Sequence, residues 1–216
     1  MGVVMRTMGP VVLARIGIDF GAGDIAVVVT EPKLVETGTE DVLELRITHF
    51  TRFAELIPFS RVEEGMDRTA EIVRKVALRA WRTEVFVDAS SLGRYASTIL
   101  REKLRETGAR IVEVQITSGG TPVEKGPVWR VPRLVLLENL SGMIATGGLV
   151  IPGELTLLVH QLKSLRARIS AARRLSVEPG PGADDDLVMA LALAVWKRVY
   201  ETELEFPPRK RVIEAI

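Results

Sequence analysis

Aspartates lie at three points where apolar segments begin or end, and acidic side chains at such points can bind a metal ion. Asp19 follows the apolar residues 16–18, Asp88 follows residues 85–87, and Asp185 and Asp186 immediately precede an apolar run. An ionised carboxylate beside a buried strand costs free energy unless it is paired or coordinated. Mg²⁺ and Mn²⁺ prefer oxygen ligands, so either cation would offset the repulsion among acids that meet at one sheet edge.

This set of donors predicts phosphodiester hydrolysis. The chain has no cysteine, which excludes disulfides, thiolate zinc sites and cysteine nucleophiles, and its two histidines are His49 and His160. In phosphodiester hydrolysis such carboxylates hold two metal ions roughly 3.5–4 Å apart, one activating water and the other stabilising the leaving oxygen. We expect Asp19 to bridge both ions, and Asp88 and the Asp185/Asp186 pair each to favour one.

Each aspartate also has a purely structural explanation. Asp19 or Asp88 can cap a turn or the next helix, and residues 184–186 can cap a helix and complement its dipole. Their order along the chain, together with their apolar flanks, favours the metal site. The choice among Asp184, Asp185 and Asp186 as the main ligand stays open at this point.

The hydrophobic pattern predicts one α/β domain over residues 1–216, with its core in residues 11–201 and a flexible basic tail in 202–216. Residues 11–18, 25–30 and 42–50 are expected as consecutive strands, the third with one solvated face. Further strands are predicted at 85–87, 110–116 and 149–151, helices at 62–81, 94–106, 132–146, 153–168 and 184–200, and loops at 117–127 and 176–183. This order predicts a mixed central β-sheet flanked by α-helices.

Basic residues gather near the last acidic cluster, although the net charge of +1 gives no overall preference for nucleic acid. The predicted DNA-binding residues are Lys163, Arg166, Arg168, Arg173 and Arg174. Basic side chains beside an acidic metal site suit contact with the phosphate backbone, with little sequence preference. The alternative is an ordinary solvated helix face.

Several motifs resemble the nuclease domain of the large subunit of viral DNA-packaging terminases. Residues 16–21 are similar to its opening strand, and residues 85–93 resemble its segment of apolar residues followed by DATGxG. Residues 116–120 and 129–133 resemble its "TxGG … VPK" stretch, and residues 148–152 are similar to its "GLxI" segment. Residues 185–194 closely resemble its "HDDLVMALALA" signature. The resemblance covers about residues 16–196.

The resemblance implies an RNase H-like fold and an endonuclease that cuts double-stranded DNA with two Mg²⁺ or Mn²⁺ ions. It also implies that the nuclease cuts concatemeric viral DNA together with a packaging ATPase motor, a small terminase subunit and a portal. The chain departs from the pattern at Asp184, where a histidine or small residue is usual, and at Ser90 and Ser91, which replace Thr-Gly. It carries no GxxxxGK[ST] loop, so we expect no ATPase domain in it.

Other functions also fit parts of the pattern. Residues 18–21 resemble a phosphate-binding turn of actin-like and sugar-kinase ATPases, a Holliday-junction resolvase shares the opening aspartate and closing acidic helix, and a silent adaptor could keep the fold. No apolar run reaches the roughly 18 residues that cross a bilayer, and no secretory signal is expected. We therefore expect a protein of the cytoplasm, the host's if it is viral.

Overall fold

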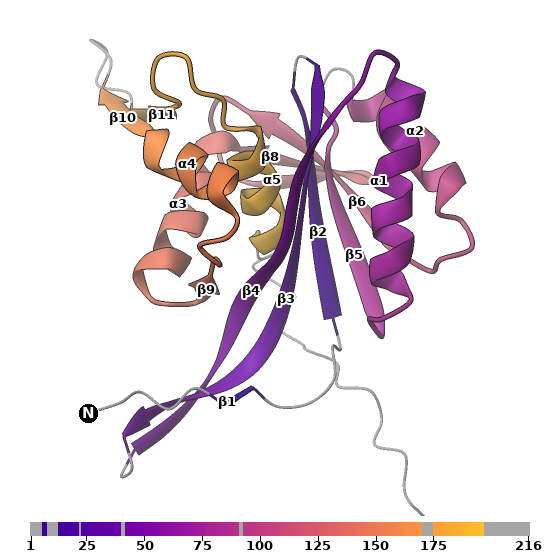
Figure 1. Ribbon diagram of the computed structural model, residues 1–216. Helices are drawn as coiled ribbons and strands as arrows, with labels where there is room; N and C mark the ends of the chain where they lie inside the picture. Colours follow the sequence, from indigo (N-terminus) through magenta and orange to yellow (C-terminus); the bar gives the residue numbers. More distant parts are fainter. Residues whose placement is uncertain are drawn as a thin grey trace, which may run out of the picture.

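The computed structural model describes residues 6–7, 13–21, 23–39, 42–90, 93–169 and 175–196. Its centre is a mixed β-sheet with helices on both faces (Figure 1). The strands are β1 (Arg6–Thr7), β2 (Leu13–Phe20), β3 (Asp24–Thr39), β4 (Val42–Pro58), β5 (Arg82–Asp88), β6 (Arg110–Thr117), β7 (Val123–Lys125), β8 (Val128–Pro132), β9 (Leu149–Val150), β10 (Arg166–Ile169) and β11 (Leu175–Glu178). The helices are α1 (Val62–Ala77), α2 (Gly93–Lys103), α3 (Arg133–Ala145), α4 (Thr156–Ser164) and α5 (Asp186–Val195).

The pairing of the strands decides which side chains meet at each edge of the sheet. Along the sheet the order is β7-β8-β6-β5-β2-β3-β4-β9, and β1 pairs with β3. β2, β3 and β4 are joined as antiparallel hairpins, whereas β5 runs parallel to β2. Ile18 of β2 lies opposite Val87 of β5. Asp19 and Asp88 therefore follow in the same register, and we call the edge that carries them the acid edge.

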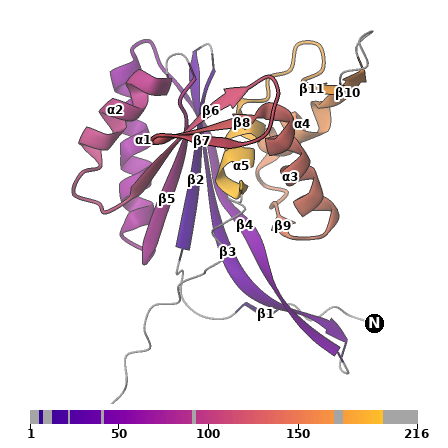
Figure 2. The same cartoon turned by 180° about the vertical axis from the view of Figure 1, so that it is seen from behind.

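The two faces of the sheet carry separate apolar clusters. α1 and α2 cover one face, and α3, α4 and α5 cover the other (Figures 1 and 2). Successive side chains of a strand point to opposite faces, so Val85 and Val87 pack toward α1 and α2 while Phe86 packs toward α5. Burial on both faces explains why β2 and β5 read as continuous apolar runs.

Helix α5 lies directly against β2. Its residues from Leu187 to Val195 are all buried, as its apolar sequence predicts. A methyl group at Gly17 of β2 would overlap the carbonyl oxygen of Ala190. A glycine at this position therefore allows the helix backbone to approach the strand, and this approach holds the start of α5 at the acid edge. Within the described ranges, no helix is long and apolar enough to span a membrane.

The prediction for the third strand was partly wrong. The strand continues to Pro58 and forms a long ribbon with β3. Its expected solvated face is reversed locally, since Thr48 is buried while Ile47 is 40% exposed. The turn after α3 covers this face, and the Arg46 guanidinium donates a hydrogen bond of 2.8 Å to the carbonyl oxygen of Thr146. Tertiary packing thus overrides the alternation of the local sequence.

Three other boundaries also differ from the predictions. The helix expected at 153–168 ends at Ser164, because residues 166–169 pair with Leu175–Glu178 in the β10–β11 hairpin, which also takes up the start of the expected 176–183 loop. The stretch 117–127 contains β7, which pairs with β8. Helix α1 ends at Ala77, leaving Trp81 68% exposed. The first two differences arise from antiparallel strand pairs that form across a turn.

We predict that Gly17→Ala destabilises the protein, because the added methyl group must push α5 away from β2. The expected loss in the free energy of unfolding, measured by urea denaturation, is about 2–3 kcal/mol. Gly119→Ala is the matched control, since a side chain there meets nothing within 4 Å. Equal stability of the two variants would contradict the close approach of α5.

Candidate metal centre

Asp19 is held at the acid edge by the β2–β3 hairpin. It pairs with Ala26 of β3 and is 7% exposed. The hairpin turn is closed by the Gly21 N–H, which donates a hydrogen bond of 2.9 Å to the carbonyl oxygen of Asp24. The strand pairing and the turn thus keep the Asp19 carboxylate in a position with little contact to water.

Asp88 ends β5 beside Asp19 and is 8% exposed. One of its carboxylate oxygens, Oδ1, accepts a hydrogen bond of 2.9 Å from the Ser90 N–H. A methyl group at Gly93 would overlap the carbonyl oxygen of Asp88, so α2 begins directly against this residue. The turn-capping explanation is thus correct for one oxygen of Asp88.

Asp185 and Asp186 reach the acid edge from the opposite face of the sheet. Asp185 occupies the N-cap position of α5, but its side chain makes no capping hydrogen bond. Its carboxylate pairs instead with the guanidinium of Arg133, the first residue of α3. The Asp186 carboxylate lies against Gly21, beside the turn that follows Asp19. Asp184 is exposed, which favours its two neighbours as the inward-facing acids.

Burial and the charges of neighbouring carboxylates raise the pKa of two of the acids, Asp19 and Asp186. Burial raises the pKa of Asp19 well above its ordinary value, and the charges of Asp88, Asp186 and Asp185 raise it further. Burial and the charges of Asp185 and Asp184 also raise the pKa of Asp186. Like charges at a poorly hydrated edge disfavour ionisation unless a proton or a cation neutralises them.

The described residues do not contain a finished coordination shell. Among them, no three histidine or acidic side chains stand together closely enough to hold a metal ion. Two of the acids have other partners: Arg133 pairs with Asp185, and the Ser90 N–H donates a hydrogen bond to Asp88. Nevertheless, the donors fit a hard divalent cation, since they are carboxylate oxygens and Asp19 is buried among other acids. Side-chain rotations would be needed to bring them onto one ion.

Sequence reasoning assigned no role to two residues that support this site. Arg133 neutralises Asp185, and the buried Gln161 accepts a hydrogen bond of 2.9 Å from the Leu187 N–H at the start of α5. Arg133 lies within the quoted motif at 129–133, at the place of the lysine in the VPK pattern, so a signal for it existed. No local signal distinguishes Gln161 from any other helical glutamine.

Only part of the predicted DNA-binding cluster can be placed. Lys163 lies near the end of α4, and Arg166 and Arg168 lie in β10, all three with exposed side chains. Arg166 donates hydrogen bonds to the carbonyl oxygens of Lys163 and Leu165, and Arg168 lies 3.8 Å from a carboxylate oxygen of Glu178. Arg173, Arg174 and the basic tail lie outside the described residues.

Comparison with solved structures finds the same fold in nuclease domains of large terminase subunits. The chain is similar to the large terminase nuclease of the thermophilic phage G20c with bound magnesium, at 18% identity and a TM-score of 0.55, over 88% of this chain and 83% of that one. It is also similar to a mutant nuclease domain of the large terminase subunit of bacterial virus Sf6 with manganese and β-thujaplicinol, at 13% identity and a TM-score of 0.60, over 89% and 90% of the two chains. No family model matches the sequence. No curated protein matches it either.

The chain therefore has an RNase H-like α/β fold. Within that class, it shares the architecture of the nuclease domains of large terminase subunits. The structure brings Asp19, Asp88, Asp185 and Asp186 to one edge of this fold, as their positions in the sequence predict.

We predict that Asp19→Asn stabilises the metal-free protein. The substitution removes a buried charge that repels Asp88 and Asp186, and the expected gain in the free energy of unfolding is about 1–3 kcal/mol. The measurement is chemical denaturation at neutral pH in the presence of a chelator. Asp67→Asn is the control, since its side chain is 69% exposed on α1. Destabilisation of Asp19→Asn would mean that Asp19 is already compensated without a cation.

We predict the opposite effect for Arg133→Gln. Without the guanidinium, the Asp185 charge is uncompensated, and the metal-free protein should lose about 1–3 kcal/mol of stability. Mn²⁺ should restore more stability to this variant than to the wild type, as followed by thermal unfolding. Arg130→Gln, at an exposed position of β8, is the control. An equal response of both variants to Mn²⁺ would show that Arg133 does not compensate the acid edge.

Proposed function

We propose that the chain is an endonuclease that cuts double-stranded DNA with Mg²⁺ or Mn²⁺, using two ions. The observation that carries the proposal is the burial of Asp19 among the carboxylates of Asp88, Asp185 and Asp186. The structures of similar fold from phage G20c hold magnesium or cobalt, and the one from virus Sf6 holds manganese. Both the donors and these likenesses support a hydrolytic nuclease.

In this proposal Asp19, Asp88, Asp185 and Asp186 are the metal ligands. Bound divalent ions would activate water and stabilise the leaving oxygen of a phosphodiester. The protein's contribution is to fix its donors: strand pairing holds Asp19 and Asp88, and Gln161 holds the start of α5. Arg133 orients Asp185 and limits the negative charge before metal binds.

The biological role that we propose is the cutting of concatemeric viral DNA during packaging. It rests on the architecture shared with terminase nuclease domains and on the sequence motifs. The proposed partners are a packaging ATPase motor, a small terminase subunit and a portal. Lys163, Arg166, Arg168, Arg173 and Arg174 are proposed to contact the phosphate backbone of the DNA.

The test is incubation of the protein with supercoiled plasmid and Mg²⁺ or Mn²⁺. The wild type should nick and then linearise the plasmid, and Asp19→Asn or Asp88→Asn should reduce the rate by more than about 100-fold, because each removes a direct ligand. Both variants should remain folded by circular dichroism.

Asp67→Asn serves as the control and should cut at the wild-type rate. Cutting of plasmid by Asp19→Asn and Asp88→Asn at the wild-type rate would overturn the proposal. Preference for a four-way junction over linear duplex would instead favour a resolvase, and absence of cutting by every form of the protein would favour an adaptor.

A further inference from the structure

Two exposed arginines flank the acid edge on the side of α1 and α2, opposite the predicted DNA-binding residues of α4 and β10. Arg61 precedes α1, and Arg94 is the second residue of α2. Both side chains are exposed. Figure 1 shows α1 and α2 on one face of the sheet and α4 on the other, with the carboxyl ends of β2 and β5 between them.

The local structure places both arginines beside the candidate metal ligands. Arg94 follows Gly93, which is packed against the carbonyl oxygen of Asp88. Arg61 lies two residues after Phe59, whose N–H donates a hydrogen bond of 3.1 Å to the Gly23 carbonyl in the turn that follows Asp19. The backbone therefore places Arg94 next to the glycine that packs on Asp88, and Arg61 near the turn that follows Asp19.

A hydrogen bond joins α1 and α2 near these two arginines, so that Arg61 and Arg94 belong to one continuous surface. The Tyr95 hydroxyl of α2 donates a hydrogen bond of 3.1 Å to the Glu63 carboxylate of α1. The neighbouring acid, Glu64, accepts a hydrogen bond of 3.1 Å from the Ser60 hydroxyl. Among the described residues, no ion pair within 4 Å joins Arg61 or Arg94 to a carboxylate, although the charge of Arg61 acts on the nearby Glu63, and both residues are exposed.

Helix stability does not explain these arginines. A positive charge in the first turn opposes the helix dipole, and the first turn of α2 contains no acidic residue. Arg61 occupies the N-cap position of α1 without making a capping hydrogen bond, whereas serine, aspartate or asparagine would stabilise that position. The dipole of α2 therefore disfavours Arg94, and Arg61 leaves the N-cap of α1 unfilled although its charge acts favourably on Glu63. Both arginines lie on the side where a polyanion must approach four carboxylates.

We propose that Arg61 and Arg94 contact the phosphate backbone of duplex DNA on the α1/α2 side of the acid edge. This inference rests on the proposed nuclease function. It adds a second group of phosphate-binding residues to the nuclease, on the opposite side of the acid edge from the first. The DNA then lies across the acid edge, with Arg61 and Arg94 on one side and Lys163 and the β10–β11 hairpin on the other. Contacts of this kind position a duplex without reading its sequence.

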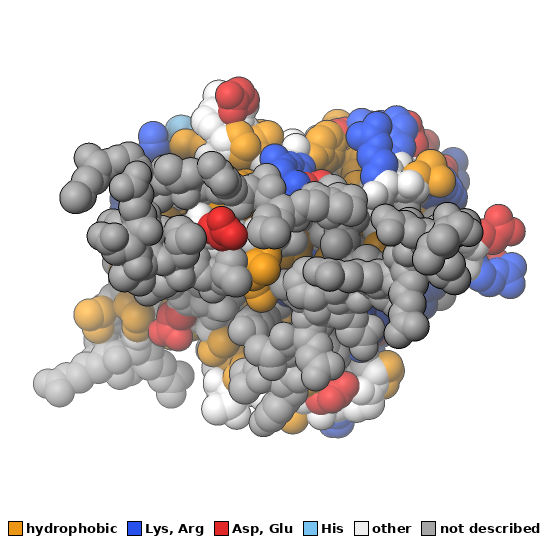
Figure 3. Space-filling view, turned by 90° about the horizontal axis from the view of Figure 1, so that it is seen from below, with side chains coloured by type: hydrophobic (Ala, Val, Ile, Leu, Met, Phe, Trp, Pro, Cys, Tyr) orange, Lys and Arg blue, Asp and Glu red, His pale blue; other side chains and the backbone are white. Residues whose placement is uncertain are grey.

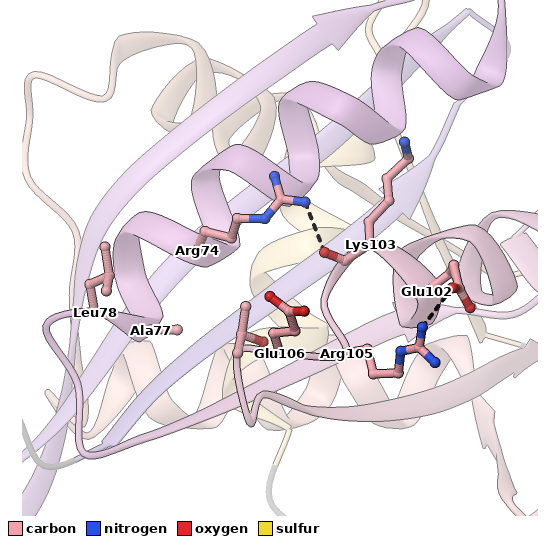
Figure 4. A pocket seen from close by; sticks show the side chains of 8 residues that line it. Arg74, Ala77, Leu78, Glu102, Lys103, Arg105 and Glu106 are labelled. Atoms are coloured by element: carbon pink, nitrogen blue, oxygen red, sulfur yellow. Dashed lines mark hydrogen bonds and ion pairs between the residues drawn. The ribbon is translucent and has the colours of Figure 1, made fainter.

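The test compares Arg61→Glu and Arg94→Glu with Arg105→Glu, which changes the net charge by the same amount. Arg105 lies just beyond the other end of α2, where its guanidinium is 3.3 Å from Glu102 beside a cavity of about 430 Å³ (Figure 4). At the end of the molecule away from the acid edge, basic and acidic side chains are interspersed among the described residues (Figure 3). A charge reversal at Arg105 should therefore have little effect on DNA.

We expect Arg61→Glu and Arg94→Glu each to weaken binding of a fluorescently labelled linear duplex by about 10-fold or more, measured by anisotropy with a chelator present. The slope of log affinity against log salt should become shallower by about 1 for each variant. Arg105→Glu should bind like the wild type. The melting temperature of Arg94→Glu should equal or exceed that of the wild type, because the new acid complements the dipole of α2.

If the wild type binds and cuts DNA but Arg61→Glu and Arg94→Glu bind the duplex with the same affinity as Arg105→Glu, this inference is overturned and the proposed function is not. A wild type that neither binds nor cuts would overturn the proposed function itself. If a charge reversal prevents folding, Arg61→Gln and Arg94→Gln replace it, with Arg105→Gln as the control and an expected loss of about 3-fold or more. In Mn²⁺, the same variants should cut linear duplex more slowly at low DNA concentration and approach the wild-type rate at saturation.

Discussion

Repulsion among carboxylates at a poorly hydrated edge is the constraint on which the arrangement of this protein depends. Asp19 and Asp88 leave neighbouring strands in register, and the close approach of α5 at Gly17 adds Asp185 and Asp186 from the other face. The acids cannot separate, because sheet register and helix packing fix their backbones. Arg133 offsets one charge and leaves the others to a proton or a cation. A fold that needed only stability would gain by replacing Asp19, so its presence argues for a ligand.

Most of the fold could be predicted because its central strands are buried on both faces. Continuous apolar runs identified β2 and β5, and the apolar circumference of α5 predicted its burial. Where the structure departs from prediction, a distant contact decides the outcome. Arg46 of β4 is held by the turn after α3, and residues 166–169 form a strand because residues 175–178 pair with them. Neither contact can be predicted from the local pattern of apolar and polar residues.

The placement of the four aspartates at one edge was predictable for the same reason, since each aspartate adjoins an apolar run. The supporting residues were harder to find, because their roles depend on how helices pack. Gln161 matters because α4 lies beside the start of α5, and Arg133 because α3 begins opposite Asp185. The choice among the three consecutive aspartates also required the structure, in which Asp184 is exposed while Asp185 and Asp186 turn inward. Spacing alone cannot supply such information.

The distribution of charge bears on how a nearly neutral chain could bind DNA, as its proposed function requires. A net charge of +1 gives no long-range attraction to DNA, so attraction must come from local charges within a Debye length of about 8–10 Å.

Arg61, Arg94 and Arg133 all lie at the start of helices beside the acid edge, where helix stability favours acidic residues. The acids lie where a metal ion would neutralise their charge, and the three arginines lie around them. On the proposed function, bound metal ions would offset the negative charge of the acids while the arginines keep theirs, so the same surface would attract phosphate more strongly than it does without metal. Metal binding and DNA binding are therefore expected to reinforce each other.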